Sequence, residues 1–363
     1  MQIAAVGANE TRLWGLTAGE RLVRIAKAQG LEKAAGDAPI LANLAFVWDP
    51  AWLRFIAANP GHVLTKGGVP VLAHVEDASK CAEIGRAMEA NEALAPMPGL
   101  NVTAYEEAGS IGNDELRERE RPFLDRLVPG NVRSLERASY FGAYKGVTDI
   151  LTKYLWPEWA LVLTRLAARI GATPNMVTAV GPALCVVATI LFWHGWYWTG
   201  LAVGLVFMVL DRVDGKLARC TITSSRWGDI FDHGIDLVHP PFWWYAWGVG
   251  LAAYGRPLDD TLFWTIMAVL VGGYVMQRLI EGAFIARFGM HIHVWRRFDS
   301  RFRLITARRN PNMVILFVPL VVGRPDIGLI AVAVWTVISL AVHLVQLLQA
   351  TAARARGRTI RSW

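Results

Sequence analysis

The sequence has few cysteines and few charged residues, and the cysteines exclude a disulfide-rich protein. Its three cysteines, Cys81, Cys185 and Cys220, are far apart and form neither a disulfide framework nor a metal-binding pattern. Charged residues make up only 18% of the 363 residues, whereas 54% are hydrophobic and the mean hydropathy is +0.32. The formal net charge of +7 would fit nucleic acid, but the positive residues stand beside long apolar runs. We therefore expect partners among membrane lipids and not nucleic acid.

The first residues, MQIAAVGANETRLWG, lack the basic and apolar regions of a secretory signal. We therefore expect the N-terminal part to stay in the cytoplasm. Residues 1–135 alternate short apolar runs, such as NLAFVW, with helical patterns, which predicts a soluble α/β domain with a mostly parallel sheet. Residues 136–175 are predicted to be a helical connector that ends in an amphipathic helix at the membrane interface.

Apolar stretches near membrane-spanning length follow, so residues 176–350 are predicted to form an all-α domain with six transmembrane helices. The stretches are about 176–198, 199–219, 227–253, 260–286, 311–323 and 326–350. Arginines gather in alternate loops and in the basic tail of residues 351–363, and the other loops are nearly uncharged. The positive-inside rule therefore predicts a multi-pass protein of the inner (cytoplasmic) membrane, with its N-terminal domain and basic loops facing the cytoplasm.

Two consecutive predicted helices carry four aspartates at helical spacing. Asp211 and Asp214 share one face of the first helix, and Asp232 and Asp236 share one face of the second. Four carboxylates near a membrane interface are strongly unfavourable unless cations bind them. Because all ligands would be oxygen atoms, Mg²⁺ fits best, with two ions expected and Mn²⁺ as the alternative metal. Solvated aspartates that pair with basic residues of the first helix are the alternative interpretation.

The spacing of these residues also resembles a known signature. The pattern is Asp211-x-x-Asp214-Gly215-x-x-Ala218-Arg219, eight residues, then Gly228-x-x-x-Asp232-x-x-x-Asp236, and it resembles the signature of the CDP-alcohol phosphotransferases at every specified position. The segment TPNMVT, residues 173–178, resembles the one that precedes the first span of this family. The resemblance covers roughly residues 145–350, and it implies six spans and a homodimer.

The resemblance implies an enzyme that transfers a substituted phosphate from a CDP-alcohol to an acceptor hydroxyl and releases CMP, in phospholipid or inositol-phosphate-type biosynthesis. It further implies that the four aspartates hold the metal ions and that Asp236 is the general base on the acceptor hydroxyl. The residues that would contact the CDP part of the donor are Asn175, Thr178, Gly215, Ala218, Arg219 and Gly228.

Arginines are concentrated between the fourth and fifth predicted spans, with six of them in the fourteen residues from Arg296 to Arg309. Topology alone does not require so many. Because arginine binds phosphate bidentately, we expect an anion pocket for a lipid or polyol phosphate acceptor at Arg278, Arg308 and Arg309. Positive charge that faces lipid headgroups is the alternative for part of this cluster.

The N-terminal segment IAAVGANETRLWG partly resembles the start of a sugar nucleotidyltransferase. Gly7 and Arg12 are present, but the further glycines and the Pro-Lys pair of such domains are missing. Asp49 could stand where these domains place a metal aspartate, or it could be an ordinary loop residue. We expect a degenerate, inactive domain that serves as scaffold, regulator or dimer contact.

Two alternatives to this interpretation remain open. A bifunctional cytidylyltransferase/phosphotransferase would make CDP-inositol in its N-terminal domain and then use it. A non-enzymatic membrane transporter or adaptor would use the aspartates differently, although the sequence lacks the second, inverted copy of the segment that many transporters have.

Overall fold

The computed structural model describes the chain except residues 35, 37, 109–121, 143–145 and 225, and of residues 226–233 it describes the backbone alone. The described chain divides into two compact units. Unit 1 comprises Met1–Gly146, Thr164–Thr173 and Gly215–Ser225, and unit 2 comprises Val147–Leu163, Pro174–Asp214 and Arg226–Trp363. The helices α5 (Trp156–Arg169) and α7 (Tyr197–Cys220) each contribute residues to both units.

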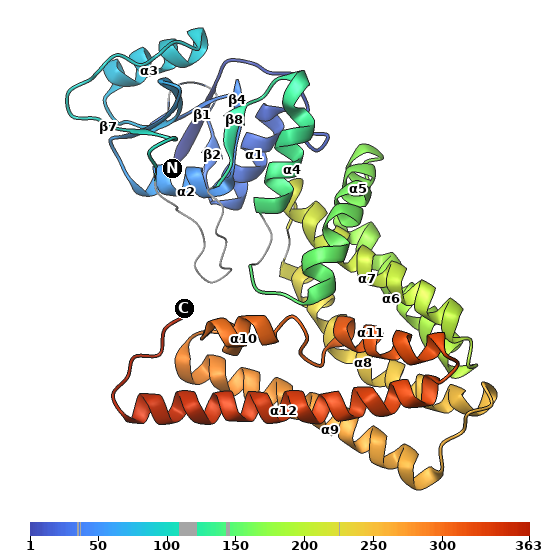
Figure 1. Cartoon of the computed structure of the whole chain (residues 1–363). Coiled ribbons are helices and arrows are strands. Elements are labelled where there is room, and N and C mark those ends of the chain that lie inside the picture. Colours follow the sequence, from blue (N-terminus) through green and yellow to red (C-terminus); the bar gives the residue numbers. More distant parts are fainter. Residues whose placement is uncertain (35, 37, 109–121, 143–145, 225) are drawn as a thin grey trace. The chain divides into compact units, whose positions relative to one another are not determined.

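Unit 1 is built on a mixed sheet (Figure 1). The order of its strands is β2-β1-β3-β6-β5-β7. Strand β6 runs antiparallel to its neighbours β3 and β5, while the other pairings in this sheet are parallel. The α/β prediction for the N-terminal part is thus confirmed. The strands of the sheet are β1 (Gln2–Val6), β2 (Glu32–Lys33), β3 (Ile40–Asn43), β5 (His62–Lys66), β6 (Val69–His74) and β7 (Asn101–Ala104), and a second, two-stranded sheet pairs β4 (Phe46–Trp48) with β8 (Leu124–Arg126).

Helices pack on both faces of this sheet, because successive strand residues point to opposite sides. Ile3 and Ile40 belong to a core with α1 (Ala18–Ala28) and α2 (Pro50–Ala58), whereas Ala4 and Leu41 belong to a core with α3 (Ala78–Ala90). The unit also contains η2 (Pro129–Asn131) and α4 (Val132–Gly142). Helix α1 begins at a capping box, in which Thr17 and Glu20 bond to each other's backbone amides.

Unit 2 is helical. Its elements besides α5 and α7 are η3 (Leu151–Leu155), α6 (Pro174–Trp193), α8 (Arg226–Ala253), α9 (Asp260–Phe288), η4 (Ile292–Val294), α10 (Arg297–Phe302), α11 (Arg309–Val321) and α12 (Pro325–Ala355). In the part of the chain that the structure describes, α6, α9 and α12 are long and apolar enough to cross a membrane. The count of six spans stays a prediction.

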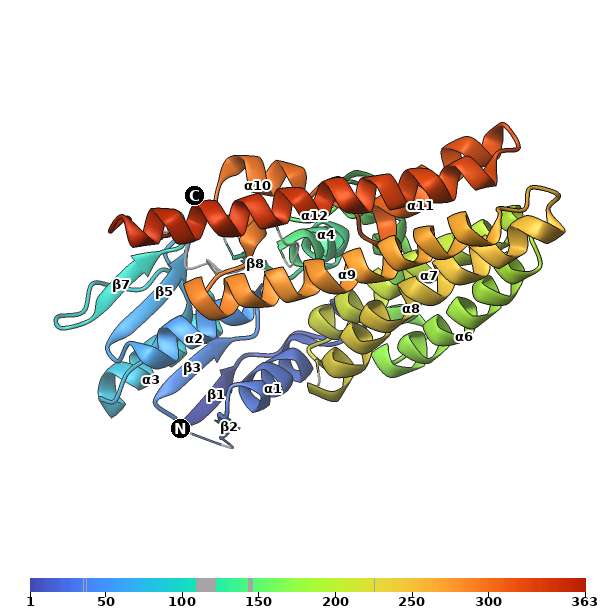
Figure 2. The ribbon, with the colours of Figure 1, turned by 90° about the horizontal axis from the view of Figure 1, so that it is seen from below.

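Small residues allow the helices of unit 2 to pack closely, as is common between membrane helices. A Cβ atom added to Gly250 of α8 would lie 1.9 Å from the carbonyl oxygen of Phe192 in α6. One added to Gly273 of α9 would lie 2.6 Å from Cγ2 of Thr336 in α12, and these two helices run side by side (Figure 2). The sequence therefore brings the backbones of these helix pairs together at glycines.

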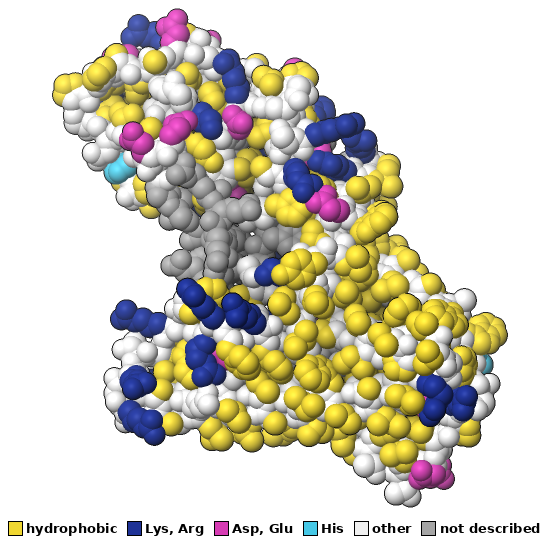
Figure 3. All heavy atoms as spheres, viewed as in Figure 1, with side chains coloured by type: hydrophobic (Ala, Val, Ile, Leu, Met, Phe, Trp, Pro, Cys, Tyr) yellow, Lys and Arg dark blue, Asp and Glu magenta, His cyan; other side chains and the backbone are white. Residues whose placement is uncertain are grey.

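Apolar side chains are widely exposed on unit 2 and on α5. Hydrophobic residues cover much of the helical surface on the face shown in Figure 3. Exposed examples are Val186 and Ile190 in α6, Phe317 and Val318 in α11, and Val337 and Leu348 in α12. On α5 the exposed apolar residues are Trp159, Val162 and Leu166. Such surfaces suit contact with lipid for unit 2 and the predicted interfacial position for α5.

Candidate metal and phosphate site

The predicted aspartates of α7 and α8 meet on one cation of the chain itself. Arg309, the first residue of α11, donates from Nη2 to Oδ2 of Asp211 at 2.6 Å. It also donates from Nη1 to Oδ1 of Asp236. The carboxylates of α7 and α8 therefore share a single guanidinium, whose side chain is only 9% exposed. Carboxylate oxygens converging on one cation are also the donor set that Mg²⁺ or Mn²⁺ takes, so these residues fit a hard divalent ion.

Asp214, the other described metal-ligand candidate, lies against α6. Its Oδ2 accepts a hydrogen bond from Oγ1 of Thr178 at 2.8 Å, and the same hydroxyl lies 2.9 Å from the carbonyl of Pro174. Asp214 is buried, whereas Asn175, one turn before Thr178, is exposed. The segment TPNMVT thus reaches the aspartate motif through Thr178.

The remaining motif residues are described to different extents. Gly228 and Asp232 lie in residues 226–233, whose side chains are outside the described part of the chain. Gly215, Ala218 and Arg219 belong to unit 1. A Cβ atom at Gly215 would lie 3.6 Å from a guanidinium nitrogen of Arg219, so glycine leaves room beside this exposed arginine.

Basic neighbours of the aspartates behave differently from one another. Arg212 lies 3.3 Å from Oδ2 of Asp211, so this aspartate has a neighbouring cation in addition to Arg309. Lys216 instead donates to the carbonyl oxygen of Tyr140 within unit 1. Arg212 therefore compensates part of the negative charge of Asp211, as the alternative interpretation of the sequence expects.

The start of α11, which carries Arg309, is fixed by a buried polar group that the sequence analysis missed. Asn310 donates from Nδ2 to Oδ1 of Asp149 at 3.0 Å and lies 3.1 Å from Oγ1 of Thr152. Asp149 in turn accepts from the backbone amide and hydroxyl of Thr152 at the start of η3. Pro311 next to Asn310 is a helix-start signal that could have drawn attention to this position.

A second charged cluster, the Glu281 cluster, consists of Arg278, Glu281, His293, Arg303, Arg308 and His343. Arg278 donates to Oε1 of Glu281 at 2.9 Å, and Arg308 donates to Oε2 at 2.5 Å. Nε2 of His293 lies 3.4 Å from the same carboxylate. Arg278 and Arg308, both predicted to line an anion pocket, therefore share the carboxylate of Glu281 in the structure.

Glu281, His293 and His343 place possible ligand atoms within 4.8 Å of one another, which is the spacing of a metal site. However, both carboxylate oxygens of Glu281 already accept from guanidinium groups. Burial lowers the pKa of His293 well below its usual range and lowers that of Arg303 to about 9. With neutral histidines, three arginines and one glutamate, the cluster carries a net charge of about +2 near pH 7, which favours an anion over a cation.

Donor groups of this cluster remain open for such an anion. Among the described residues, Nε of Arg278, Nε of Arg308 and Nη1 of Arg303 are buried and have no hydrogen-bond partner. Buried polar groups in proteins are nearly always paired, so each exception asks for an explanation. A bound phosphate or carboxylate would supply the missing acceptors.

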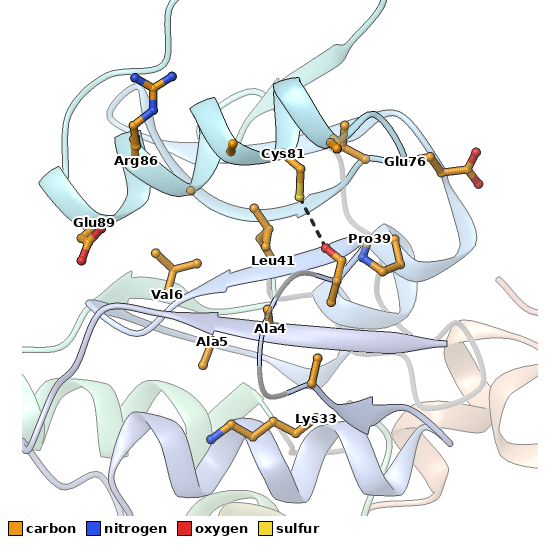
Figure 4. A pocket seen from close by; sticks show the side chains of 17 residues that line it. Ala4, Ala5, Val6, Lys33, Pro39, Leu41, Glu76, Cys81, Arg86 and Glu89 are labelled. Atoms are coloured by element: carbon orange, nitrogen blue, oxygen red, sulfur yellow. Dashed lines mark hydrogen bonds between the residues drawn. The ribbon is translucent and has the colours of Figure 1, made fainter.

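Among the residues that the structure describes, Asp49 and the cavity of the N-terminal domain show no such convergence of charged groups. Asp49 is the N-cap of α2, and its side chain accepts from the amide of Ala51 at 2.8 Å, so it has a local structural role. A cavity of about 940 Å³ lies between α3 and the strands β1 and β3. Its charged lining residues, Lys33, Glu76, Arg86 and Glu89, are exposed and point apart (Figure 4).

Comparison with known families agrees with the motif. Residues 172–299 match the family model described as CDP-alcohol phosphatidyltransferase. This segment is a CDP-alcohol phosphatidyltransferase domain. The resemblance stated from the motif is thereby confirmed, and the domain belongs to a family of membrane-bound transferases.

Relatives of this CDP-alcohol phosphatidyltransferase domain include two kinds of enzyme. Human cholinephosphotransferase 1 is 31% identical over 185 residues, which cover 47% of this chain and 43% of that protein. Phosphatidylinositol phosphate synthase of Cutibacterium acnes is 33% identical over 114 residues, covering 30% of this chain and 53% of that protein. A crystal structure of the Mycobacterium tuberculosis phosphatidylinositol phosphate synthase with CDP-DAG bound aligns with a TM-score of 0.41 at 20% identity, over 52% of this chain and 94% of that one. The chain spans about half the length of the curated relatives it matches.

Proposed function

We propose that this chain is an integral membrane CDP-alcohol phosphotransferase. It would transfer a substituted phosphate from a CDP-alcohol to an acceptor hydroxyl and release CMP, in phospholipid or inositol-phosphate-type biosynthesis. The observation that carries the proposal is the convergence of Asp211 of α7 and Asp236 of α8 on one guanidinium. An intact motif whose carboxylates meet in space is what a metal-dependent phosphotransferase needs.

The aspartates Asp211, Asp214, Asp232 and Asp236 would hold divalent ions, Mg²⁺ or Mn²⁺. When bound, the ions would neutralise the diphosphate of the donor and stabilise the departing CMP. Asp236 is the residue proposed to accept the proton of the acceptor hydroxyl. The freed oxygen then bonds to the phosphorus that carries the alcohol, the bond from that phosphorus to the bridging oxygen breaks, and its electron pair leaves with CMP.

Residues near the motif would bind the CDP part of the donor. Thr178 is well placed for this role, because its hydroxyl already touches Asp214. Asn175, Gly215, Ala218, Arg219 and Gly228 are proposed from the motif alone.

The Glu281 cluster would receive an anionic group of the acceptor, such as a lipid or polyol phosphate. Arg278 and Arg308 supply unpartnered Nε donors for it among the described residues. Arg309 is also predicted to bind the acceptor. In this structure it contacts Asp211 and Asp236 instead, so Arg309 would act between these aspartates and the Glu281 cluster.

The proposal extends to location and assembly. The apolar helices α6, α9 and α12 and the exposed apolar surface support a multi-pass membrane protein. An inner-membrane location with the site facing the cytoplasm follows from the arginine-rich loops. A homodimer is proposed by resemblance to the family.

A CMP-release assay tests the proposed function. Purified full-length protein with Mg²⁺ would be given CDP-diacylglycerol, CDP-inositol or CDP-choline together with diacylglycerol or a polyol phosphate. CMP should appear with one donor, and Asp236→Asn should reduce the rate by about 10²–10⁴-fold because the general base is lost. The matched control is Asp326→Asn in α12, whose carboxylate pairs with Arg324.

The control variant should keep the rate of the unaltered protein. CMP release that survives in Asp236→Asn would refute the proposed base. The absence of CMP with every donor and acceptor would refute the enzyme and favour a transporter or adaptor.

A further inference from the structure

Helix α1 of the N-terminal domain binds the C-terminal end of α7. Arg21 donates from Nη1 to the carbonyl oxygen of Cys220 at 2.9 Å. Arg24, one turn later, donates from Nη1 to the carbonyl oxygen of Thr221 at 2.7 Å. All four residues belong to unit 1, although nearly 200 residues of sequence separate the partners, 199 in one bond and 197 in the other.

These two bonds meet a specific need of the helix end. The last carbonyl groups of a helix have no partner within the helix and carry partial negative charge. Arg21 and Arg24 supply both hydrogen bonds and positive charge at that point. The guanidinium of Arg21 is buried with only 4% exposure, and this burial lowers its pKa to about 10, so it is still charged near pH 7.

Two further contacts hold the same stretch. Lys216 is buried, donates to the carbonyl oxygen of Tyr140 at 3.2 Å and lies 5.1 Å from the centroid of its ring. After the helix ends, Ile222 adopts a positive φ of 56° and packs against the core that α1 and α2 form with the sheet. A β-branched residue takes this conformation only where its surroundings enforce it.

The stretch held in this way includes part of the CDP-alcohol motif. Gly215, Ala218 and Arg219 lie in the last two turns of α7, within the segment that unit 1 contains. We propose that the N-terminal domain is a clamp on the end of α7, and that Arg21 and Arg24 are positioning residues for the donor-binding part of the motif. This assigns a function to a domain that lacks the glycines and lysine of an active nucleotidyltransferase.

The experiment combines a readout that needs no substrate with one that does, because the donor role rests on the proposed function. Hydrogen–deuterium exchange would be measured in full-length protein over residues 215–225. The amides of Thr221, Ile222 and Thr223 donate to carbonyls of the last turns of α7. In the variant Arg21→Met with Arg24→Met, their exchange should accelerate by about tenfold or more, since the helix end opens more often.

Arg86→Met, in the exposed part of α3, is the matched control and should leave this exchange unchanged. If the double variant does not fold, Arg24→Met alone removes one of the two bonds and should show a smaller acceleration in the same amides. Unchanged exchange in a folded variant would overturn the clamp.

The second readout is steady-state kinetics with the donor that releases CMP. The KM for the donor should rise more than kcat falls, because the variant alters donor positioning and leaves the aspartates in place. Faster exchange with unchanged KM would overturn the positioning role. Faster exchange in a protein that shows no activity with any donor would support the clamp while the proposed function fails.

Discussion

Arg309 occupies the oxygen atoms that a metal ion would need, so the variant Arg309→Gln should bind divalent metal more tightly than the unaltered protein. In the structure the guanidinium bonds to Asp211 and Asp236 at once. A metal ion that takes these oxygens must first displace Arg309. Glutamine removes the charge, and the carboxylates are then left for the metal.

The expected size of the effect follows from the two bonds. A hydrogen bond to a charged group contributes about 1.5–3 kcal/mol, so two such bonds contribute about 3 kcal/mol or more. Because 1.4 kcal/mol is tenfold in Kd, the full effect would be about a hundredfold. Arg212 remains 3.3 Å from Asp211 and reduces the gain. We therefore expect tightening by at least about tenfold, since the remaining cation still competes.

Electron paramagnetic resonance of free Mn²⁺ measures this Kd directly in detergent-solubilised protein. Arg308→Gln is the matched control, because the neighbouring arginine donates to Glu281 and not to the aspartates. If Arg309 competes with the metal, the metal-free variant Arg309→Gln should unfold at a lower temperature than the unaltered protein. Its unfolding temperature should also rise more when Mn²⁺ is added. Equal or weaker Mn²⁺ binding in Arg309→Gln would refute the competition, and so would an equal gain in Arg308→Gln.

Two further predictions concern stability and are measured by thermal unfolding in detergent. Gly250→Ala should lower the free energy of unfolding by about 1–3 kcal/mol or more, because the added carbon collides with the carbonyl of Phe192. The control is Gly272→Ala, where nothing lies within 4 Å of the added carbon, and it should cause no comparable loss. Equal melting temperatures of the two variants would contradict the close α6–α8 packing. Glu281→Gln should lower the free energy of unfolding by about 3 kcal/mol, because it leaves mostly buried guanidinium groups without their counterion. Glu20→Gln, in an exposed pair with Arg12, should change little, and a similar loss in both variants would argue against a buried network.

Features that depend on local spacing could be predicted from the sequence. The aspartates of α7 are three residues apart, and helical geometry alone places them on one face. The α/β nature of the N-terminal domain followed in the same way from alternating patterns. The antiparallel direction of β6 within the six-stranded sheet did not follow, because strand order depends on pairings between distant segments.

The partners of the arginines could not be predicted, because they lie far away in the sequence. Arg309 is 98 residues from Asp211 and 73 from Asp236. The arginine-rich loop indicated an anion pocket, but charge counting does not distinguish Arg308, which binds Glu281, from Arg309, which binds the aspartates. Likewise, the N-terminal part of the sequence gave no sign that Arg21 and Arg24 hydrogen-bond to the end of α7.

The start of α11 links the two charged groups of residues in unit 2. Arg308 and Arg309 are adjacent, yet one binds the Glu281 cluster and the other binds the aspartates of α7 and α8. Asn310 fixes this helix start through Asp149. The Cα atoms of adjacent residues are about 3.8 Å apart. The start of α11 would therefore set the distance between an anionic group bound to Arg308 and a reacting hydroxyl at Asp236. A shift of this segment should therefore alter metal binding and acceptor binding together, whereas a change in the α1 clamp should alter donor binding alone.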